Sequence, residues 1–246
     1  MTSDLLDNLN DEQKAAVTHG DGPLLIVAGA GTGKTTVITR RIAWLIQEGR
    51  CKPNEILALT FTDKAAGEME ERVDRLLPYG YVNLWISTFH SFCERILKAH
   101  ALEIGLPNDF TLLDTTASWM LVRKNIDRFD LDYYRPLGNP AKFIHALLKH
   151  FSRCKDEGVT TDQYREYAQK LQLDADAAPG TGTAEYDKIA ELANAYGVYR
   201  QLLLEHDAMD FGDLIVEALR LFRERPHILE RTRSAFRFLL VDEFQD

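Results

Sequence analysis

The chain has 246 residues, of which 45% are hydrophobic and 27% charged, an ordinary globular composition that allows one or two domains. It contains no apolar stretch near eighteen residues and no basic-then-apolar leader, so it predicts a cytoplasmic protein without a membrane span. The formal net charge of −9 argues against a protein that coats nucleic acid by bulk electrostatics, although a local binding groove is compatible with it.

Strands and helices alternate over the first hundred residues. Residues 23–28 form a short apolar run bounded by glycines, which predicts a buried strand, and helical spacing of apolar residues follows over 35–47. The same order then returns twice, with strands predicted at 56–61 and 82–87, helices at 63–77 and 89–102, and a last strand at 238–241. Such alternation predicts an α/β fold with a parallel sheet.

Strand signals disappear between residues 103 and 206. Four helices are predicted in this interval, at 115–128, 142–155, 162–171 and 185–205. Residues 174–183 are rich in Ala, Gly, Thr and Asp, which is typical of a mobile loop. We therefore expect an inserted all-helical subdomain at 103–206 and a discontinuous domain made of 1–102 and 207–246.

Cysteines and histidines show no metal-site spacing. Cys51, Cys93 and Cys154 lie far apart, are odd in number and form no CxxC pair. No HExxH pattern places two imidazoles on one helical face, and His145 and His150 are five residues apart. We expect neither a disulfide framework nor a zinc site.

A glycine-rich segment between the first predicted strand and helix fits the phosphate-loop pattern, apart from an alanine in its first position. It comprises Ala28, Gly29, Ala30, Gly31, Thr32, Gly33, Lys34 and Thr35. Glycines let backbone N–H groups turn toward a phosphate, and the helix N-terminus adds the positive end of its dipole. We expect Lys34 to contact the β- and γ-phosphates and Thr35 to bind Mg²⁺. A glycine-rich turn that binds nothing is the alternative, and the flanking strand and helix disfavour it.

Two adjacent carboxylates, Asp242 and Glu243, follow the last predicted strand. The carboxyl ends of parallel strands form the edge where α/β sheets bind ligands, so this pair should lie at the same edge as the phosphate loop. We expect Asp242 to hold Mg²⁺ and Glu243 to orient or deprotonate the attacking water. A solvated acidic turn would explain the pair alone, but not together with the phosphate loop.

Six short blocks occur in the order found in UvrD-like superfamily 1 helicases. They are LNDEQ at 9–13, AGAGTGKTT at 28–36, LALTFTDKAAGEM at 57–69, STFHSF at 87–92, MDFGDL at 209–214 and VDEFQD at 241–246. The chain therefore resembles the N-terminal portion of such a helicase, with a RecA-like ATP-binding domain. The resemblance implies ATP-driven 3′-to-5′ translocation on single-stranded DNA, and repair, plasmid replication and recombination all stay open as its process.

The resemblance also implies roles for individual residues. Gln13 would read the adenine, Thr36 would lie against the nucleotide, and two loops would contact single-stranded DNA through Thr60, Phe61, Thr62, Lys64, Thr88, Phe89 and His90. From the residues alone, Gln13 reads as an exposed residue of a helix capped by Asn10, and both phenylalanines as core residues. MDFGDL has a plain explanation as a helix start with Asp210 as N-cap.

The chain departs from the family pattern in two ways. Thr36 stands where many relatives have an arginine, with Arg40 and Arg41 one turn later. Nothing corresponds to the arginines of the second motor domain, so the fragment should bind Mg-ATP but hydrolyse it poorly. Expected partners are ATP, single-stranded DNA, its junctions with duplex, and a C-terminal motor domain.

Two other classes of protein are alternatives to the helicase. A GTPase or small-molecule kinase would need a guanine-reading NKxD pattern or an acceptor pocket, and the sequence has neither. A non-enzymatic DNA-binding module stays open for the fragment, and it predicts DNA affinity that does not depend on Lys34.

Overall fold

The computed structural model describes residues 3–29, 31–77, 84–134, 140–177 and 183–245, which divide into two compact units. Unit 1 comprises Met1–Phe92 with Arg225–Asp246, and unit 2 comprises Cys93–Glu224. The sequence-based division differs, because unit 2 takes most of α5 (Phe89–His100) and all of α10 (Phe211–Glu224). No helix among the described residues is long and apolar enough to cross a membrane.

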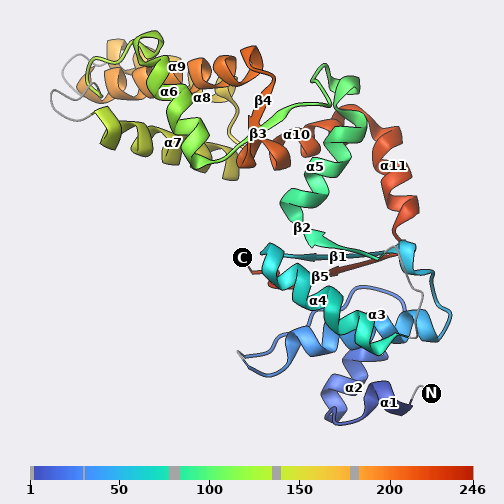
Figure 1. Cartoon of the computed structure of the whole chain (residues 1–246). Helices are drawn as coiled ribbons and strands as arrows, with labels where there is room; N and C mark the ends of the chain where they lie inside the picture. The colour runs from blue at the N-terminus through green and yellow to red at the C-terminus, as the bar shows by residue number, and fades with distance from the viewer. Residues whose placement is uncertain (1–2, 30, 78–83, 135–139, 178–182, 246) are drawn as a thin grey trace. The chain divides into compact units, whose positions relative to one another are not determined.

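Unit 1 is built on a three-stranded parallel sheet in the order β2-β1-β5 (Figure 1). The strands are β1 (Ile56–Thr60), β2 (Trp85–Thr88) and β5 (Phe238–Val241). Thr60 pairs with Thr88 and Leu59 with Val241, so the three carboxyl ends meet at one edge. The α/β class and the parallel sheet predicted from the sequence are confirmed.

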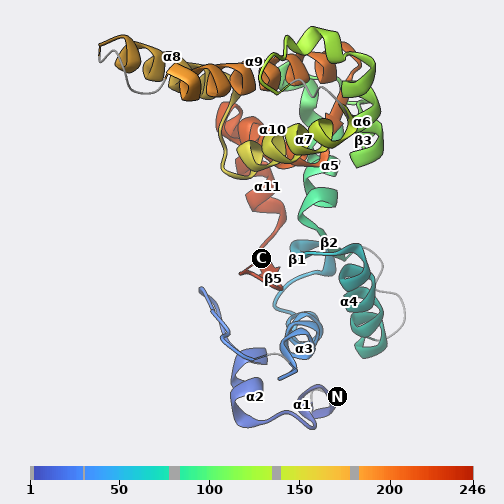
Figure 2. The ribbon, with the colours of Figure 1, turned by 90° about the vertical axis from the view of Figure 1, so that its left-hand side faces the viewer.

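Helices lie on both sides of this sheet, and those on one side pack against it (Figures 1 and 2). On one side lie α3 (Lys34–Gln47) and α4 (Asp63–Leu76), and on the other lies α11 (Pro226–Ala235). Apolar residues of α3, β1, α4 and β5 form one buried core that includes Ile42, Ile56, Met69 and Leu240. The remaining elements of unit 1 are α1 (Ser3–Leu6), α2 (Asp11–Val17), the 3-10 turn η1 (Pro53–Glu55) and the start of α5.

The first predicted strand is wrong. Residues 23–28 are extended but form no strand, and within the described part of the chain no backbone hydrogen bond joins them to a neighbour. Leu25 is 74% exposed and Val27 88% exposed. An apolar run is compatible with a buried strand only where a partner supplies ladder hydrogen bonds and cover on both faces.

The other predicted elements of unit 1 are confirmed to within a few residues. The helix expected at 35–47 is α3, the one at 63–77 is α4, and the strand at 238–241 is β5. The helix expected at 89–102 ends at His100 and continues as the 3-10 turn η2 (Ala101–Ile104). Part of the strand expected at 82–87 lies outside the described residues, and β2 runs from Trp85 to Thr88.

Unit 2 is mainly helical. Its longest elements are α7 (Pro140–Asp156), α8 (Thr161–Ala177), α9 (Thr183–Glu205) and α10, and α8 lies alongside α9 (Figure 2). The helix expected at 115–128 is split into α6 (Thr115–Lys124) and the 3-10 turn η3 (Ile126–Phe129). A separate core here contains Phe129, Ile144, Phe151, Tyr199 and Leu202.

The predicted insertion is not entirely helical. β3 (Thr111–Leu113) pairs in parallel with β4 (Ala208–Asp210), which lies just past the predicted end of the insertion. Three residues are too few to show a period-two pattern, so β3 carries no recognisable sequence signal. It forms because β4 supplies its hydrogen-bond partners.

The loop predicted at 174–183 is also shorter than expected. Residues 174–177 complete α8, and Ala175 and Ala177 favour this continuation of the helix. Residues 178–182 of that prediction lie outside the described part of the chain, and α9 begins at Thr183.

Candidate functional site

The glycine-rich loop ends at the first residue of α3. Gly31 and Gly33 have φ angles of 77° and 86°, in the left-handed region that favours glycine. Gly33 is the N-cap residue of α3, and no side chain caps the helix there. The first N–H groups of α3 are therefore left for another acceptor, as an anion site at a helix N-terminus requires. Ala30 lies outside the described residues.

The lysine of this loop turns back onto the loop itself. Its ammonium lies 3.4 Å from the carbonyl oxygen of Ala28 and 3.5 Å from that of Gly29. The Thr32 hydroxyl also donates to the Gly29 oxygen, at 2.7 Å. The two lysine contacts are long, so a phosphate oxygen could replace them at small cost, since an ionised acceptor binds more strongly.

The two motifs from opposite ends of the chain meet in unit 1. The Thr35 hydroxyl donates to Oδ2 of Asp242 at 3.1 Å, although 207 positions separate them. The backbone N–H of Asp242 donates to the Leu59 oxygen at 2.8 Å, which extends the β1–β5 ladder by one residue. The sheet therefore fixes the aspartate, and α3 fixes the threonine.

The residues at this contact fit a magnesium ion. Asp242 is 5% exposed, and no lysine or arginine of the described chain forms an ion pair with it. A buried carboxylate without a cation is costly, and a divalent cation would compensate its charge. The carboxylate and the Thr35 hydroxyl are oxygen ligands of the kind that Mg²⁺ prefers.

Glu243 follows at a sharp turn in the chain. Its φ of 54° is unusual for a residue other than glycine, and its N–H donates to Oδ1 of Asp242 at 3.1 Å. The Glu243 carboxylate is half-buried and accepts a hydrogen bond from the Gln245 side chain. The turn therefore separates the two carboxylates, which gives them different surroundings.

Gln13 joins the N-terminal helix to the phosphate loop. Its Nε2 donates to the carbonyl oxygen of Thr32 at 3.0 Å. Its Oε1 accepts from the N–H of Asn10, whose side chain in turn accepts from the N–H of Gln13. The capping box and the contact to Thr32 together use one acceptor and one donor position of the amide. One N–H and one lone pair are left, which is what pairing with an adenine edge needs.

Thr36 and the arginines after it face different groups. The Thr36 carbonyl accepts from the Thr39 hydroxyl within α3. Arg40 and Arg41 donate to backbone carbonyls of the N-terminal segment. No role for these arginines is predicted from the sequence, yet Arg41 stands on the apolar face of α3 between Ile38 and Leu45, where the helical pattern favours a hydrophobic residue. A charged residue at this apolar position is the sequence signal from which a role for Arg41 could have been predicted.

The residues expected to contact DNA follow the adjacent ends of β1 and β2. Phe61 is 59% exposed and Phe89 39% exposed, so the core alternative is wrong for both. Lys64 is also exposed, with its ammonium 4.0 Å from Glu68. The register pairs Thr60 with Thr88, and each phenylalanine is the next residue, which brings the two aromatic side chains to the same edge.

The threonines of these loops are either buried or hydrogen-bonded to a nearby backbone N–H group. Thr60 and Thr88 are buried, and the Thr60 hydroxyl has no hydrogen-bond partner among the described residues. Thr88 accepts from the N–H of Ser91, and Thr62 caps α4 by accepting from Ala65. His90 is partly buried. Phe61, Phe89, Lys64 and Thr62 are thus the exposed members of the set, and the Thr62 hydroxyl already caps α4.

The MDFGDL segment forms the end of β4 and the start of α10 in unit 2. Asp210 and Asp213 accept from each other's backbone N–H at 3.1 and 3.0 Å, so the predicted N-cap is confirmed. The Lys155 ammonium lies 2.6 Å from Oδ2 of Asp210 and 2.9 Å from Oδ1 of Asp213. Although burial acts in the opposite direction, the pKa of Asp210 is lowered, because Lys155 favours its charged form.

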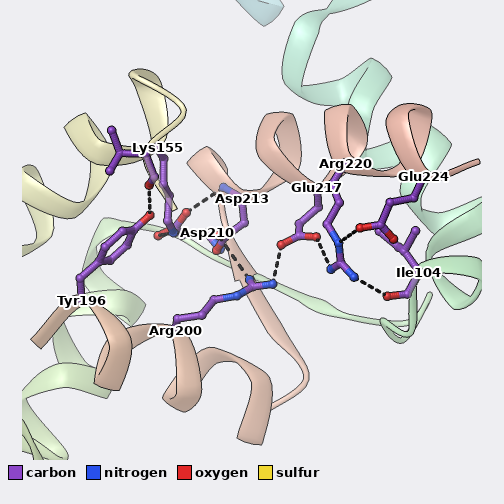
Figure 3. A network of polar contacts seen from close by, with 10 residues as sticks. Ile104, Lys155, Tyr196, Arg200, Asp210, Asp213, Glu217, Arg220 and Glu224 are labelled. Carbon is purple, nitrogen blue, oxygen red and sulfur yellow. Dashed lines mark hydrogen bonds and ion pairs between the residues drawn. The ribbon is translucent and has the colours of Figure 1, made fainter. Parts of the chain in front are cut away.

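This cluster extends along α10, and we call it the unit 2 ion network (Figure 3). Arg200 of α9 bridges Asp213 and Glu217, and Arg220 pairs with Glu217 and Glu224 and donates to the Ile104 oxygen. The side chains of Lys155, Asp213 and Glu217 are nearly inaccessible. Because these groups satisfy one another, the network stabilises the helix packing and offers little to a ligand.

The family described as UvrD/REP helicase N-terminal domain matches residues 9–246. The ATP-dependent DNA helicase PcrA of Bacillus subtilis (strain 168) is 37% identical over 247 residues, an alignment covering 100% of this chain and 30% of that protein. The PcrA helicase of Staphylococcus aureus (strain Mu50) is 38% identical over 242 residues, again covering 30% of its length. The chain therefore spans about 30% of the length of these relatives.

Proposed function

The chain belongs to the UvrD/REP helicase N-terminal domain family, and we propose that it is the ATP-binding motor portion of an ATP-dependent 3′-to-5′ DNA helicase. The observation that carries this proposal is the 3.1 Å hydrogen bond from Thr35 to Asp242. It unites a phosphate loop with a carboxylate at one sheet edge, the arrangement that nucleotide hydrolysis requires.

Four residues divide the work at the nucleotide. Lys34 binds the β- and γ-phosphates as a point charge, and the N-terminus of α3 adds backbone donors. Thr35 and Asp242 would hold Mg²⁺, which when bound neutralises phosphate charge. Glu243 orients and deprotonates the attacking water, because it stands one residue beyond the metal-binding carboxylate and is less buried.

The exposed aromatic residues would form the binding site for single-stranded DNA. Phe61 and Phe89 follow neighbouring strands and would stack on successive bases, which needs no particular sequence because every base has a flat face. Lys64 supplies a charge for the phosphate backbone next to them. Single-stranded DNA would therefore bind along the edge formed by β1 and β2.

The isolated chain should bind ATP far better than it hydrolyses it. Phosphoryl transfer depends on charge stabilisation, and arginines supplied by a second domain contribute about 10³- to 10⁵-fold in comparable systems. This chain spans about 30% of its relatives. We therefore propose a C-terminal motor domain as the partner that completes the active site, with ss/ds junctions as the substrate of the whole protein.

The test is Mg-ATP affinity and steady-state hydrolysis with and without single-stranded DNA. We expect Lys34→Ala to weaken Mg-ATP binding by about ten- to a hundredfold, because a charged hydrogen bond is lost. Glu243→Gln should leave binding within about threefold, since it keeps the shape of the side chain and touches no phosphate. Turnover of the unaltered chain should be slow and change little on addition of DNA.

Two surface substitutions serve as controls, Lys52→Ala and Glu70→Gln, since both residues are exposed in unit 1. Neither should alter binding. Fast turnover that needs no DNA and survives Glu243→Gln would contradict the helicase assignment. DNA binding that persists while Mg-ATP binding is absent from the unaltered chain would instead favour a non-enzymatic DNA-binding module.

A further inference from the structure

Two consecutive arginines of α3 hold the N-terminal segment of unit 1 by its backbone. Arg40 donates through NH1 to the carbonyl oxygens of Leu5 and Asp7. Arg41 donates through NH1 to Ala16, Val17 and His19, at 3.2, 3.1 and 2.8 Å, and through NH2 to Gly20 at 3.3 Å. A single guanidinium thus gathers four carbonyl groups from five consecutive residues.

Because Arg41 is buried, its N–H donors must be satisfied by protein groups and not by water. The residue is 8% exposed, and burial, followed by repulsion from Arg50, lowers the pKa of its guanidinium. A buried cation is stable only when its donors are satisfied. Ala16 and Val17 belong to the last turn of α2, whose carbonyls lack partners within the helix and carry the negative end of its dipole. Arg41 therefore caps this helix from outside.

The capped helix carries Gln13, and it is too short to hold its position alone. α2 has seven residues, which is below the length at which an isolated helix is stable. Its fixed points are the capping box at Asn10, a small core around Val17 and Val37, and the two bonds from Arg41 to its last turn. Arg41 also holds His19 and Gly20, where the chain leaves α2 toward the phosphate loop.

We propose that Arg41 is a positioning residue for base selection. By fixing the carboxyl end of α2, it keeps the Gln13 amide at the Thr32 carbonyl of the phosphate loop, with one donor and one acceptor left for adenine. Arg41 directs its hydrogen bonds to backbone carbonyls and acts on the base through Gln13. The inference rests on the proposed function, because it presumes that the loop binds a nucleoside triphosphate.

The test compares the affinities of Mg-ATP, Mg-GTP and Mg-tripolyphosphate for the 246-residue chain. In Arg41→Met we expect the ratio of ATP to GTP affinity to fall by about three- to tenfold, as for one lost hydrogen bond. Tripolyphosphate affinity should stay within about twofold, because the loop and Lys34 are unchanged. A merely structural role would weaken all three ligands together.

Two further variants test whether Arg41 acts through Gln13. Gln13→Ala should lower the same ratio, and adding Arg41→Met to it should lower the ratio no further, because both remove one interaction. Arg41→Lys keeps the charge but cannot bridge four carbonyls, so it should fold and still lose part of the selectivity. Arg75→Met, an exposed arginine of α4, is the matched control and should change nothing.

Failures of the two proposals can be told apart. If the unaltered chain does not bind Mg-ATP, the proposed function is wrong. If it binds Mg-ATP with a preference that Gln13→Ala abolishes and both Arg41 variants leave intact, only the role of Arg41 is overturned. A chain that binds ATP and GTP equally also overturns the inference, since no base selection would exist to position.

Discussion

The two units use buried charge in opposite ways. In unit 1, Asp242 is buried with a hydroxyl and an N–H as its partners, and no lysine or arginine of the described chain pairs with it. In unit 2, the carboxylates of Asp213 and Glu217 are equally buried but meet Lys155 and Arg200. The first arrangement leaves charge for a ligand to neutralise, whereas the second neutralises itself. Burial of a charged group alone therefore does not identify a functional site, and its partners must be counted.

The largest effect should come from removing the cation at the centre of the unit 2 ion network. Lys155→Met leaves the buried Asp213 and the partly buried Asp210 without their shared partner, and breaking such a pair costs about 3–5 kcal/mol in the free energy of unfolding. The measurement is urea unfolding followed by Trp119, the tryptophan of unit 2, with Trp44 and Trp85 changed to Phe.

Lys149→Met is the matched control for that experiment, because Lys149 is an exposed lysine on the same helix. Its free energy of unfolding should change by less than about 0.5 kcal/mol. A loss below about 1 kcal/mol in Lys155→Met would mean that the network contributes little, and the contrast between the units would disappear.

The corresponding change in unit 1 should spare stability and remove binding. Asp242→Asn keeps an acceptor for Thr35 while it removes a buried uncompensated charge, so the free energy of unfolding should change by less than about 1 kcal/mol. Mg-ATP affinity should fall by about ten- to a hundredfold, because the charged ligand to the metal is lost. Calorimetric titration with and without Mg²⁺ measures this, since only the magnesium-dependent part should change.

Asp74→Asn, at an exposed position of α4, is the control for the loss of one carboxylate. If Asp242→Asn unfolds the chain as severely as Lys155→Met, then Asp242 is a structural residue. The site in unit 1 would in that case resemble the network in unit 2.

The same contrast explains what the sequence could and could not predict. The phosphate loop and the β5 carboxylates are continuous motifs, so α3, β5 and the meeting of Thr35 with Asp242 follow from local pattern, although the strand predicted before the loop does not form. The unit 2 ion network has no such pattern, because Lys155, Arg200 and Asp213 come from three separate elements. Only the tertiary fold brings them within 4 Å.

Two misjudged elements illustrate the same limit. Residues 23–28 have the composition of a buried strand, but strand formation depends on a partner that composition does not specify. β3 has only three residues and exists because β4 lies beside it. Arg41 could have been found from its place on an apolar helix face, although its four carbonyl partners could not.

The smallest expected effect on stability comes from an exposed ion pair of unit 2. Comparing this pair with the buried network shows whether pairing alone, without burial, contributes to stability. Arg128 donates two hydrogen bonds to Glu205, at 2.7 and 2.8 Å, and the hydrogen bond from Arg128 is the main reason that the pKa of Glu205 is lowered to about 2. A carboxyl whose pKa is lowered on folding adds stability above its unfolded pKa of about 4.5, and this stability is lost as the pH falls toward 2.

In Arg128→Gln, NMR titration of the Glu205 carboxyl should find its pKa back near 4.5, while Arg165→Gln should leave that pKa unchanged. Because water screens this pair, the loss of stability that accompanies the rise in pKa should be small, and the unfolding midpoint at pH 7 should fall far less than in Lys155→Met. A large change there would mean that exposed and buried pairs of unit 2 contribute alike, and that burial is not what makes the Lys155 cluster matter.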